Sequence, residues 1–158
     1  MDGHGMDDGA EPIVYIDRSE IRAGGLEELK AGIRRLVAFL EPLEPRLLSY
    51  GFHIDEEAAT MTVVAVHPDP ASLELHLEIG GPQFRRLAHL LTLTSIECYG
   101  RPSERALEQL RRKAAALGDG ATILVVGRFT GFTHLGSTAG PPRTARGPGA
   151  DPDEAPEA

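Results

Sequence analysis

The sequence predicts an α+β domain of the ferredoxin-like type, in which elements in βαββαβ order form an antiparallel sheet with both helices on one face. Short runs rich in β-branched and aromatic residues alternate with amphipathic segments in that order along the chain. Glycine, proline and acidic residues separate these runs, as turns require. An extra C-terminal helix and strand are expected after the sixth element.

The first half of the chain supplies a strand, a helix and a hairpin. The run IVYID at 13–17 predicts a strand, and apolar residues at helical spacing predict a helix over 26–40 that two following prolines end. Further strands are predicted at 46–54 and 60–67. Because these two runs are close in sequence, they are expected to pair as an antiparallel hairpin.

A second helix is predicted after Asp69-Pro70, a pair typical of a helix start, with Asp69 as the N-cap. It is expected to break at Gly80-Gly81-Pro82 and to continue as a second segment through Leu91. A strand at 92–99 completes the βαββαβ order.

The remaining elements lie outside that basic pattern. Ser103 is expected to cap a third helix, which Gly118 closes. A last strand is predicted from 122, running on, with bends at Gly127 and Gly131, towards position 135.

The expected domain spans 12–135, between tails at 1–11 and 136–158 that are predicted to be disordered. The second tail is rich in glycine, proline and charge, so it cannot bury enough apolar surface to offset its ordering entropy. Most of the net charge of −8 lies in these tails. The middle of the chain is nearly neutral and has no basic patch, so nucleic acid is not an expected partner.

The composition also suggests a location. The sequence has no apolar run long enough to span a bilayer, and its acidic N-terminus lacks the features of a signal peptide. Its single cysteine, Cys98, excludes an intrachain disulfide framework and is expected to pack as a small apolar residue. A cytoplasmic protein without a membrane partner is therefore expected.

One face of the predicted sheet would be left uncovered, and it carries Val64 and Val66. An exposed apolar face of that size normally has a partner. The expected partner is a second copy of the chain, giving a homodimer packed sheet to sheet. The alternative is that the extra helix and strand cover part of this face or its edge.

The strand ending VAVHPD, the helix PASLELHLE and the run GPQFRRLAHLL after a glycine break resemble the antibiotic biosynthesis monooxygenase-like (ABM) domains of the dimeric α+β barrel superfamily. The resemblance covers about residues 13–99. It implies a dimeric α+β barrel and a cofactor-independent oxygenation of an aromatic or polyketide-like substrate. His76 and Phe84 match the family's helix histidine and aromatic residue. The chain has no tryptophan, whereas relatives often carry one after the third strand.

The candidate catalytic base is His76, which shares a helical stripe with Leu73 and Leu77 and should point between helix and sheet. The alternative is a core histidine bonded to a backbone carbonyl. The candidate ligand-binding residues are Tyr50, His53, His67, Leu73, Phe84, Glu97 and Tyr99, and the expected ligand is a small apolar molecule. For Glu97 the alternative is a salt bridge to Arg85 or Arg86.

No metal site and no cofactor are expected. His67, Asp69 and His76 match no metal-binding spacing, and Asp69 is better explained as a helix cap. The glycine pairs lack the patterns of nucleotide-binding loops. Two functions stay open: an ABM-type enzyme, or a non-catalytic binding or assembly protein of the same fold. A pocket closed by Phe84, Leu73 and Leu77 favours the second, and an open pocket with a buried ionisable group favours the enzyme.

Overall fold

A computed structural model describes residues 11–134 of the chain. The predicted tails therefore lie outside the described residues, apart from Glu11, and their disorder stays a prediction. The elements follow one another in the order β1 (Ile13–Ile21), α1 (Leu26–Leu40), η1 (Glu41–Leu43), β2 (Ser49–Asp55), β3 (Thr60–His67), α2 (Pro70–Arg85), η2 (Ala88–Leu90), β4 (Leu91–Tyr99), α3 (Glu104–Leu117) and β5 (Gly118–Val126).

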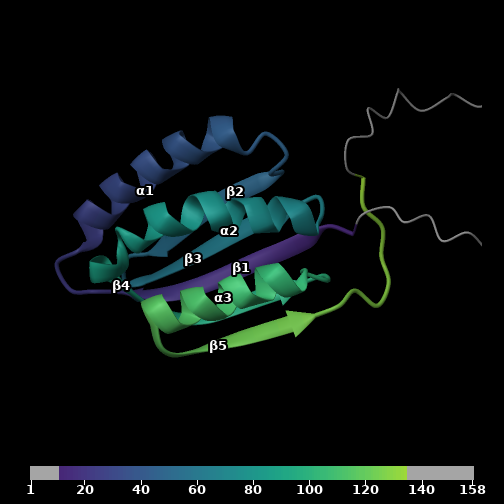
Figure 1. Ribbon diagram of the computed structural model, residues 1–158. Coiled ribbons are helices and arrows are strands. Elements are labelled where there is room, and N and C mark those ends of the chain that lie inside the picture. Colours follow the sequence, from purple (N-terminus) through teal and green to yellow (C-terminus); the bar gives the residue numbers. More distant parts are fainter. Residues whose placement is uncertain (1–10, 135–158) are drawn as a thin grey trace, which may run out of the picture.

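The strands form one five-stranded sheet in the order β2-β3-β1-β4-β5, visible in Figure 1. All neighbouring strands are antiparallel except β4 and β5, which run parallel because α3 crosses between them. The βαββαβ order and the β2–β3 hairpin are confirmed. The α3–β5 unit extends the sheet at the β4 edge.

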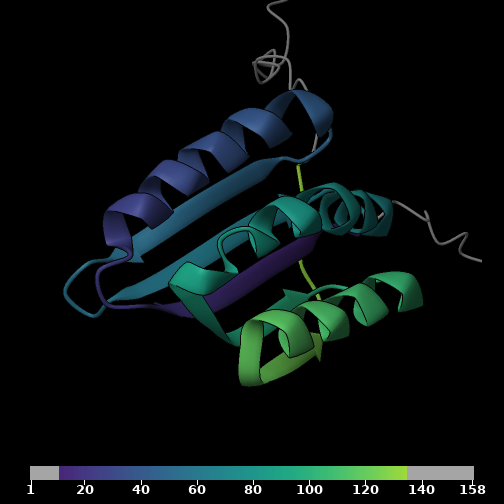
Figure 2. The same cartoon turned by 60° about the vertical axis from the view of Figure 1, so that its left-hand side comes forward.

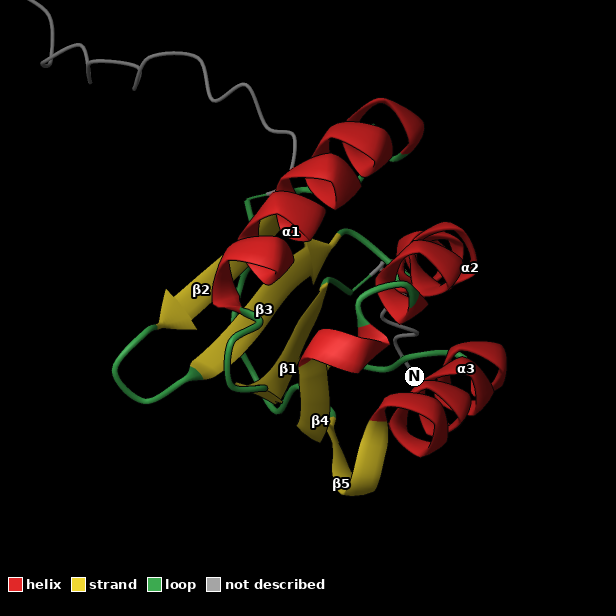
Figure 3. Ribbon diagram, turned by 90° about the vertical axis from the view of Figure 1, so that its left-hand side faces the viewer, coloured by secondary structure: helices red, strands yellow, loops and turns green. Residues whose placement is uncertain are grey.

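All three helices cover the same face of the sheet, as Figures 2 and 3 show from two sides. The core lies between them and the sheet and includes Leu29, Leu40, Leu73, Ile96 and Leu110. The alternative in which the extra elements cover the second face is wrong, because α3 packs beside α2 on the first face. The alternative in which they cover an edge of the sheet is confirmed, because β5 pairs with β4.

The opposite face stays uncovered in the described chain. It carries the strand residues that alternate with the core, among them Val14, Ile16, Val64, Val66, Leu124 and Val126, none of which is buried. Residues in this alternation point away from the helices. The structure therefore leaves an apolar sheet face open, as the sequence predicted. No helix of residues 11–134 has both the length and the apolar character needed to cross a bilayer.

Strand β1 is longer than the predicted run at 13–17. Its buried positions continue through Asp17, Ser19 and Ile21, so the alternation does not stop at the first polar residue. Both polar side chains face the helices. The strand thus places a carboxylate inside the domain.

The predicted break in the second helix is wrong. Helix α2 runs through Gly80-Gly81-Pro82 to Arg85, although glycine and proline both weaken helices. Gly80 and Phe84 are buried on its inner side, and a Cβ at Gly80 would lie 3.5 Å from Leu40 of α1. Packing against the core therefore outweighs the local helix propensity. The second helical segment is only the short turn η2.

Other strand boundaries also differ from prediction. Strand β2 begins at Ser49, and β5 begins at Gly118 with no loop after α3 and ends at Val126. Gly118 makes this direct junction possible, because a Cβ there would lie 2.8 Å from the Leu93 carbonyl oxygen and 2.9 Å from that of Ala114. The caps at Asp69 and Ser103 are confirmed by side-chain hydrogen bonds to the amides of Ser72 and Ala106.

Candidate functional site

A cleft between α2, α3 and the sheet has two lobes. The outer lobe lies between the two helices and has a volume of about 210 Å³. The inner lobe reaches the sheet and has a volume of about 20 Å³, enough for about one water molecule. Both lobes are lined by Leu77, Gly81, Phe84 and Lys113, so they adjoin one another.

His76 lines the inner lobe and forms a buried pair with Glu44. Helix α2 carries His76 on its buried side, and the turn after η1 brings Glu44 to it, with Nδ1 at 2.9 and 3.0 Å from the two carboxylate oxygens. A carboxylate only accepts, so Nδ1 carries the proton and Nε2 is left to accept one. This is the arrangement of a histidine base oriented by an acid. The expected alternative, a backbone carbonyl partner, is wrong.

Two aromatic side chains pack around His76. The Tyr50 ring lies edge-on at 4.8 Å, and the His67 ring lies at 5.3 Å. Burial raises the pKa of Tyr50 well above its ordinary value, with Asp17 and Glu44 adding to the effect, so its hydroxyl stays protonated and can donate. Tyr50 also lines the inner lobe.

His67 is fully buried and neutral. Its Nδ1 lies 2.9 Å from the Ser72 hydroxyl, and its Nε2 has no partner among the described residues. Burial lowers the pKa of His67 to about 3, and His76 adds to the lowering. The ring therefore packs in the core and is not a proton carrier near neutral pH.

Because of His67, the folded chain is expected to lose stability in acid. The unfolded chain protonates His67 below about pH 6.5, whereas the folded chain does not until about pH 3, so the unfolded state is favoured as the pH falls. Between pH 6.5 and pH 5 we expect a loss of about 2 kcal/mol from this residue. Urea denaturation at both pH values measures it. His67→Leu should flatten this pH dependence, and an unchanged slope in that variant would contradict the prediction.

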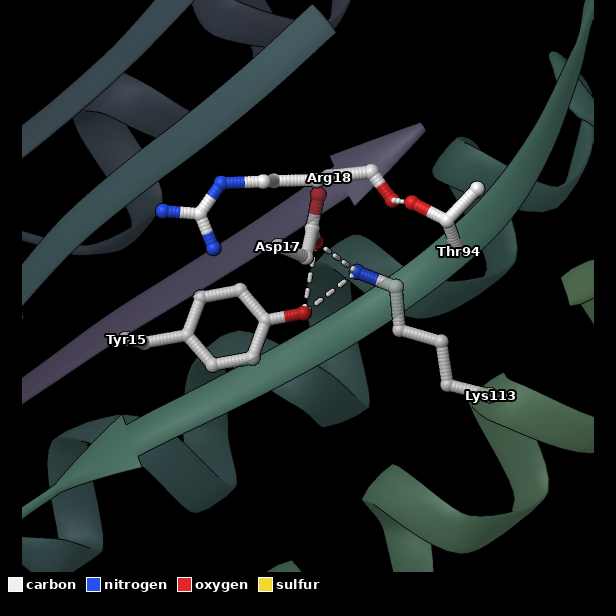
Figure 4. Close-up of polar contacts among 5 residues, drawn as sticks. All are labelled: Tyr15, Asp17, Arg18, Thr94 and Lys113. Carbon is white, nitrogen blue, oxygen red and sulfur yellow. Dashed lines mark hydrogen bonds and ion pairs between the residues drawn. The ribbon is translucent and has the colours of Figure 1, made fainter. Parts of the chain in front are cut away.

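Tyr15, Asp17 and Lys113 form a second polar cluster at the inner lobe, drawn in Figure 4. Tyr15 donates to Asp17 Oδ2 at 2.6 Å, and Lys113 Nζ donates to Tyr15 Oη at 2.8 Å and to Asp17 Oδ2 at 2.7 Å. Burial, reinforced by Asp17, raises the pKa of Tyr15 well above its ordinary value. The ammonium lies 4.5 Å from the centre of the Phe84 ring, a cation–π contact.

Sequence reasoning missed Glu44, Tyr15, Asp17 and Lys113. Two features of the sequence could have indicated Asp17 and Lys113. Asp17 is in phase with Ile13 and Ile21 on β1, which marks an acid on a buried face. Lys113 is one of two lysines among sixteen basic residues, so arginine is the ordinary choice in this chain. No local pattern joins Glu44 to His76, since 32 positions separate them.

The predicted ligand-binding residues fall into three groups. Tyr50 and Phe84 line the cleft, while Leu73 and His67 are buried in the core beside it. His53, Glu97 and Tyr99 lie on the open face of the sheet, away from the cleft. There Glu97 pairs with Arg18 at 2.7 Å, rather than with Arg85 or Arg86, and Tyr99 donates to it at 3.1 Å.

Asp69, considered above with His67 and His76 as a metal ligand, caps α2 and pairs with Arg46. Among residues 11–134, no three His, Cys, Asp or Glu side chains are grouped so as to hold a metal ion. Cys98 is fully buried, and burial raises the pKa of its thiol to about 11.

Solved structures of similar fold exist. MupZ from Pseudomonas fluorescens has a TM-score of 0.60 at 20% identity, covering 82% of this chain and 99% of its own. Rv0793 from Mycobacterium tuberculosis has a TM-score of 0.50 at 15% identity, covering 60% and 98%. SnoaB from Streptomyces nogalater, a cofactor-independent oxygenase, has a TM-score of 0.49 at 16% identity, covering 60% and 96%.

The likenesses to MupZ and Rv0793 show the fold. The chain has the ferredoxin-like fold that the ABM-like resemblance implies, and the likeness to MupZ extends beyond residues 13–99. No protein-family model matches the sequence, and no curated protein matches it.

Proposed function

We propose that the chain binds a small aromatic molecule in the α2–α3 cleft and oxygenates it without a cofactor, with His76 as the base. The observation that carries this proposal is the His76–Glu44 pair at the inner end of a largely apolar cleft. A buried ionisable pair beside a cavity is the arrangement that favours an enzyme. The fold and the ABM-like resemblance support the same reaction class.

The chemistry needs an electron-rich ring and dioxygen. His76 Nε2 takes the proton of the substrate hydroxyl, and Glu44 stabilises the imidazolium that forms. The resulting phenolate shares its negative charge with the ring carbon para to the oxygen, and that carbon bonds to dioxygen. One oxygen atom becomes a new carbonyl and the other leaves as water, with both its hydrogens drawn from the substrate. The substrate thereby loses four electrons and dioxygen gains four.

A second function is favoured by one observation. The inner lobe has room for about one water molecule, and Leu77 and Phe84 stand between it and the outer lobe. A binding or assembly protein with a filled interior would look like this. Turnover, rather than binding, separates the two functions.

Gly81 offers a test. It lines both lobes, and a Cβ there would meet no atom within 4 Å. The probe is 1,5-dihydroxynaphthalene in the dark, with oxygen uptake and quinone absorbance as the readouts. We expect wild type to consume one dioxygen per quinone formed. Gly81→Leu should lose most of this activity by filling the cleft.

Gly81→Ala is the matched control. It should keep the activity and gain about 0.5–1 kcal/mol of stability, because alanine favours a helix more than glycine does. No turnover by wild type above the rate without protein would refute the enzyme and leave the binding protein. Equal turnover by the Leu and Ala variants would place the reaction outside this cleft.

The proposal includes a homodimer packed through the open sheet faces and a cytoplasmic location. The apolar face that carries Val64 and Val66 supports the dimer, since two copies related by a two-fold axis would cover each other's faces. The single, buried Cys98 is compatible with a reducing compartment.

Val64→Asp or Val66→Asp is expected to weaken the dimer at least tenfold or to reduce solubility, because a carboxylate would be buried without a partner. Native mass spectrometry over a concentration series measures this change. Ala115→Asp, on the exposed side of α3, is the control and should leave the mass unchanged. An unchanged dimer mass and stability in both valine variants would exclude sheet-to-sheet packing.

A further inference from the structure

Asp17 carries a buried acceptor that no described residue satisfies. The residue is 0% exposed, and its Oδ2 takes the hydrogen bonds from both Tyr15 and Lys113. Its Oδ1 has no partner among residues 11–134. A buried carboxylate oxygen without a donor is unfavourable, so a donor brought by a ligand would be stabilised there. Asp17 lines the inner lobe.

Lys113 has a spare donor at the same place. An ammonium has three N–H groups. Two of them go to Tyr15 Oη and Asp17 Oδ2, and no other oxygen or nitrogen of the described chain accepts the third. The contact with the Phe84 ring holds the ammonium at the boundary of the two lobes. A single ion pair thus places an unpartnered acceptor and a spare donor beside the inner lobe.

The geometry points to this pair as the binding site for the hydroxyl group of a phenol or enol, which donates to Asp17 Oδ1 and accepts from Lys113 Nζ. The inference rests on the proposed function and names its substrate class. A hydroxyl suits the site because it is donor and acceptor at once. A ligand carboxylate would meet Asp17 and a ligand ammonium would meet Lys113, so each ion would face a like charge.

The sizes of the lobes agree with this ligand. The inner lobe, about 20 Å³, admits a single water-sized group such as a hydroxyl. The outer lobe, about 210 Å³, is lined by apolar groups including Leu77, Pro82 and Leu117, and it suits one or two aromatic rings. Because Lys113 comes from α3, the helix outside the βαββαβ core supplies this selectivity.

The test compares the binding of 2-naphthol and 2-fluoronaphthalene to the intact wild-type chain by ligand fluorescence. Fluorine is no larger than a hydroxyl and keeps both rings, but it has no proton to donate. We expect 2-naphthol to bind at least about tenfold more tightly, since hydrogen bonds to charged groups are the strong ones. Equal binding of the two compounds overturns this inference alone. Failure of both to bind overturns the proposed function with it.

A double variant tests whether Asp17 and Lys113 cause the preference for 2-naphthol. D17N/K113M removes both charges at once, and the amide oxygen that replaces the carboxylate can still accept from Tyr15. We expect the preference of this variant for the naphthol to fall to within about threefold, because neutral hydrogen bonds replace charged ones. Circular dichroism shows whether the variant is folded. An undiminished preference in the folded variant overturns the assignment to Asp17 and Lys113, and the wild-type comparison decides the inference if the variant does not fold.

Discussion

Replacing Lys113 with methionine is expected to lower the free energy of unfolding by about 3–5 kcal/mol. Asp17 is fully buried, and Lys113 is the only cation bonded to it within the described chain. Methionine keeps much of the lysine's apolar stem over Phe84 but leaves the carboxylate with Tyr15 as its one donor among residues 11–134. A buried charge without its partner is strongly destabilising. Urea denaturation at neutral pH measures the change.

The other lysine of the chain is the matched control. Lys30 pairs with Glu27 and Glu56, which are both exposed, so Lys30→Met should cost far less stability than Lys113→Met. The double variant D17N/K113M should recover much of the stability that the single variant loses, because no unpaired charge remains. A loss for Lys113→Met as small as that for Lys30→Met would show that the ion pair contributes little.

Local sequence patterns predicted most of the fold. The alternation in β3 and the apolar stripe of α1 depend only on neighbouring residues, and both elements appear with the predicted bounds. The wrong predictions lie where tertiary packing, rather than the local sequence, determines the secondary structure. Gly80-Gly81-Pro82 stays helical because α2 packs on α1 and the core, and β5 begins at Gly118 because β4 offers its edge directly after α3.

The site was harder to predict than the fold. His76 was found because a single helical stripe places it towards the sheet, but its partner Glu44 comes from a turn before β2. Likewise Asp17 and Lys113 meet only because α3 folds back over β1, 96 positions along the chain. Glu97 and Tyr99 lie on the open face because the pairing of β4 with β5 shifts register between Leu93 and Ser95, which changes the alternation along β4.

Replacing His76 with glutamine is expected to lower kcat for 1,5-dihydroxynaphthalene by about 10²–10⁴, the usual contribution of a positioned base. Glutamine can still donate to the buried Glu44, so the carboxylate keeps a hydrogen bond and the fold should persist. KM should change little, because the substrate hydroxyl and rings bind at other groups of the cleft. The combination of low kcat and unchanged KM identifies a group that acts in the transition state.

Two further variants separate catalysis from structure. Glu44→Gln removes the charge that stabilises the imidazolium, and we expect kcat to fall by about 10–10², less than for His76→Gln. His89→Gln is the matched control, because the side chain of His89 is 61% exposed and pairs with the exposed Glu28. If His76→Gln and His89→Gln both keep the wild-type kcat while remaining folded, the base is another residue. A rise in KM at constant kcat would instead make His76 a binding group, which is the behaviour expected of a protein that holds its ligand without transforming it.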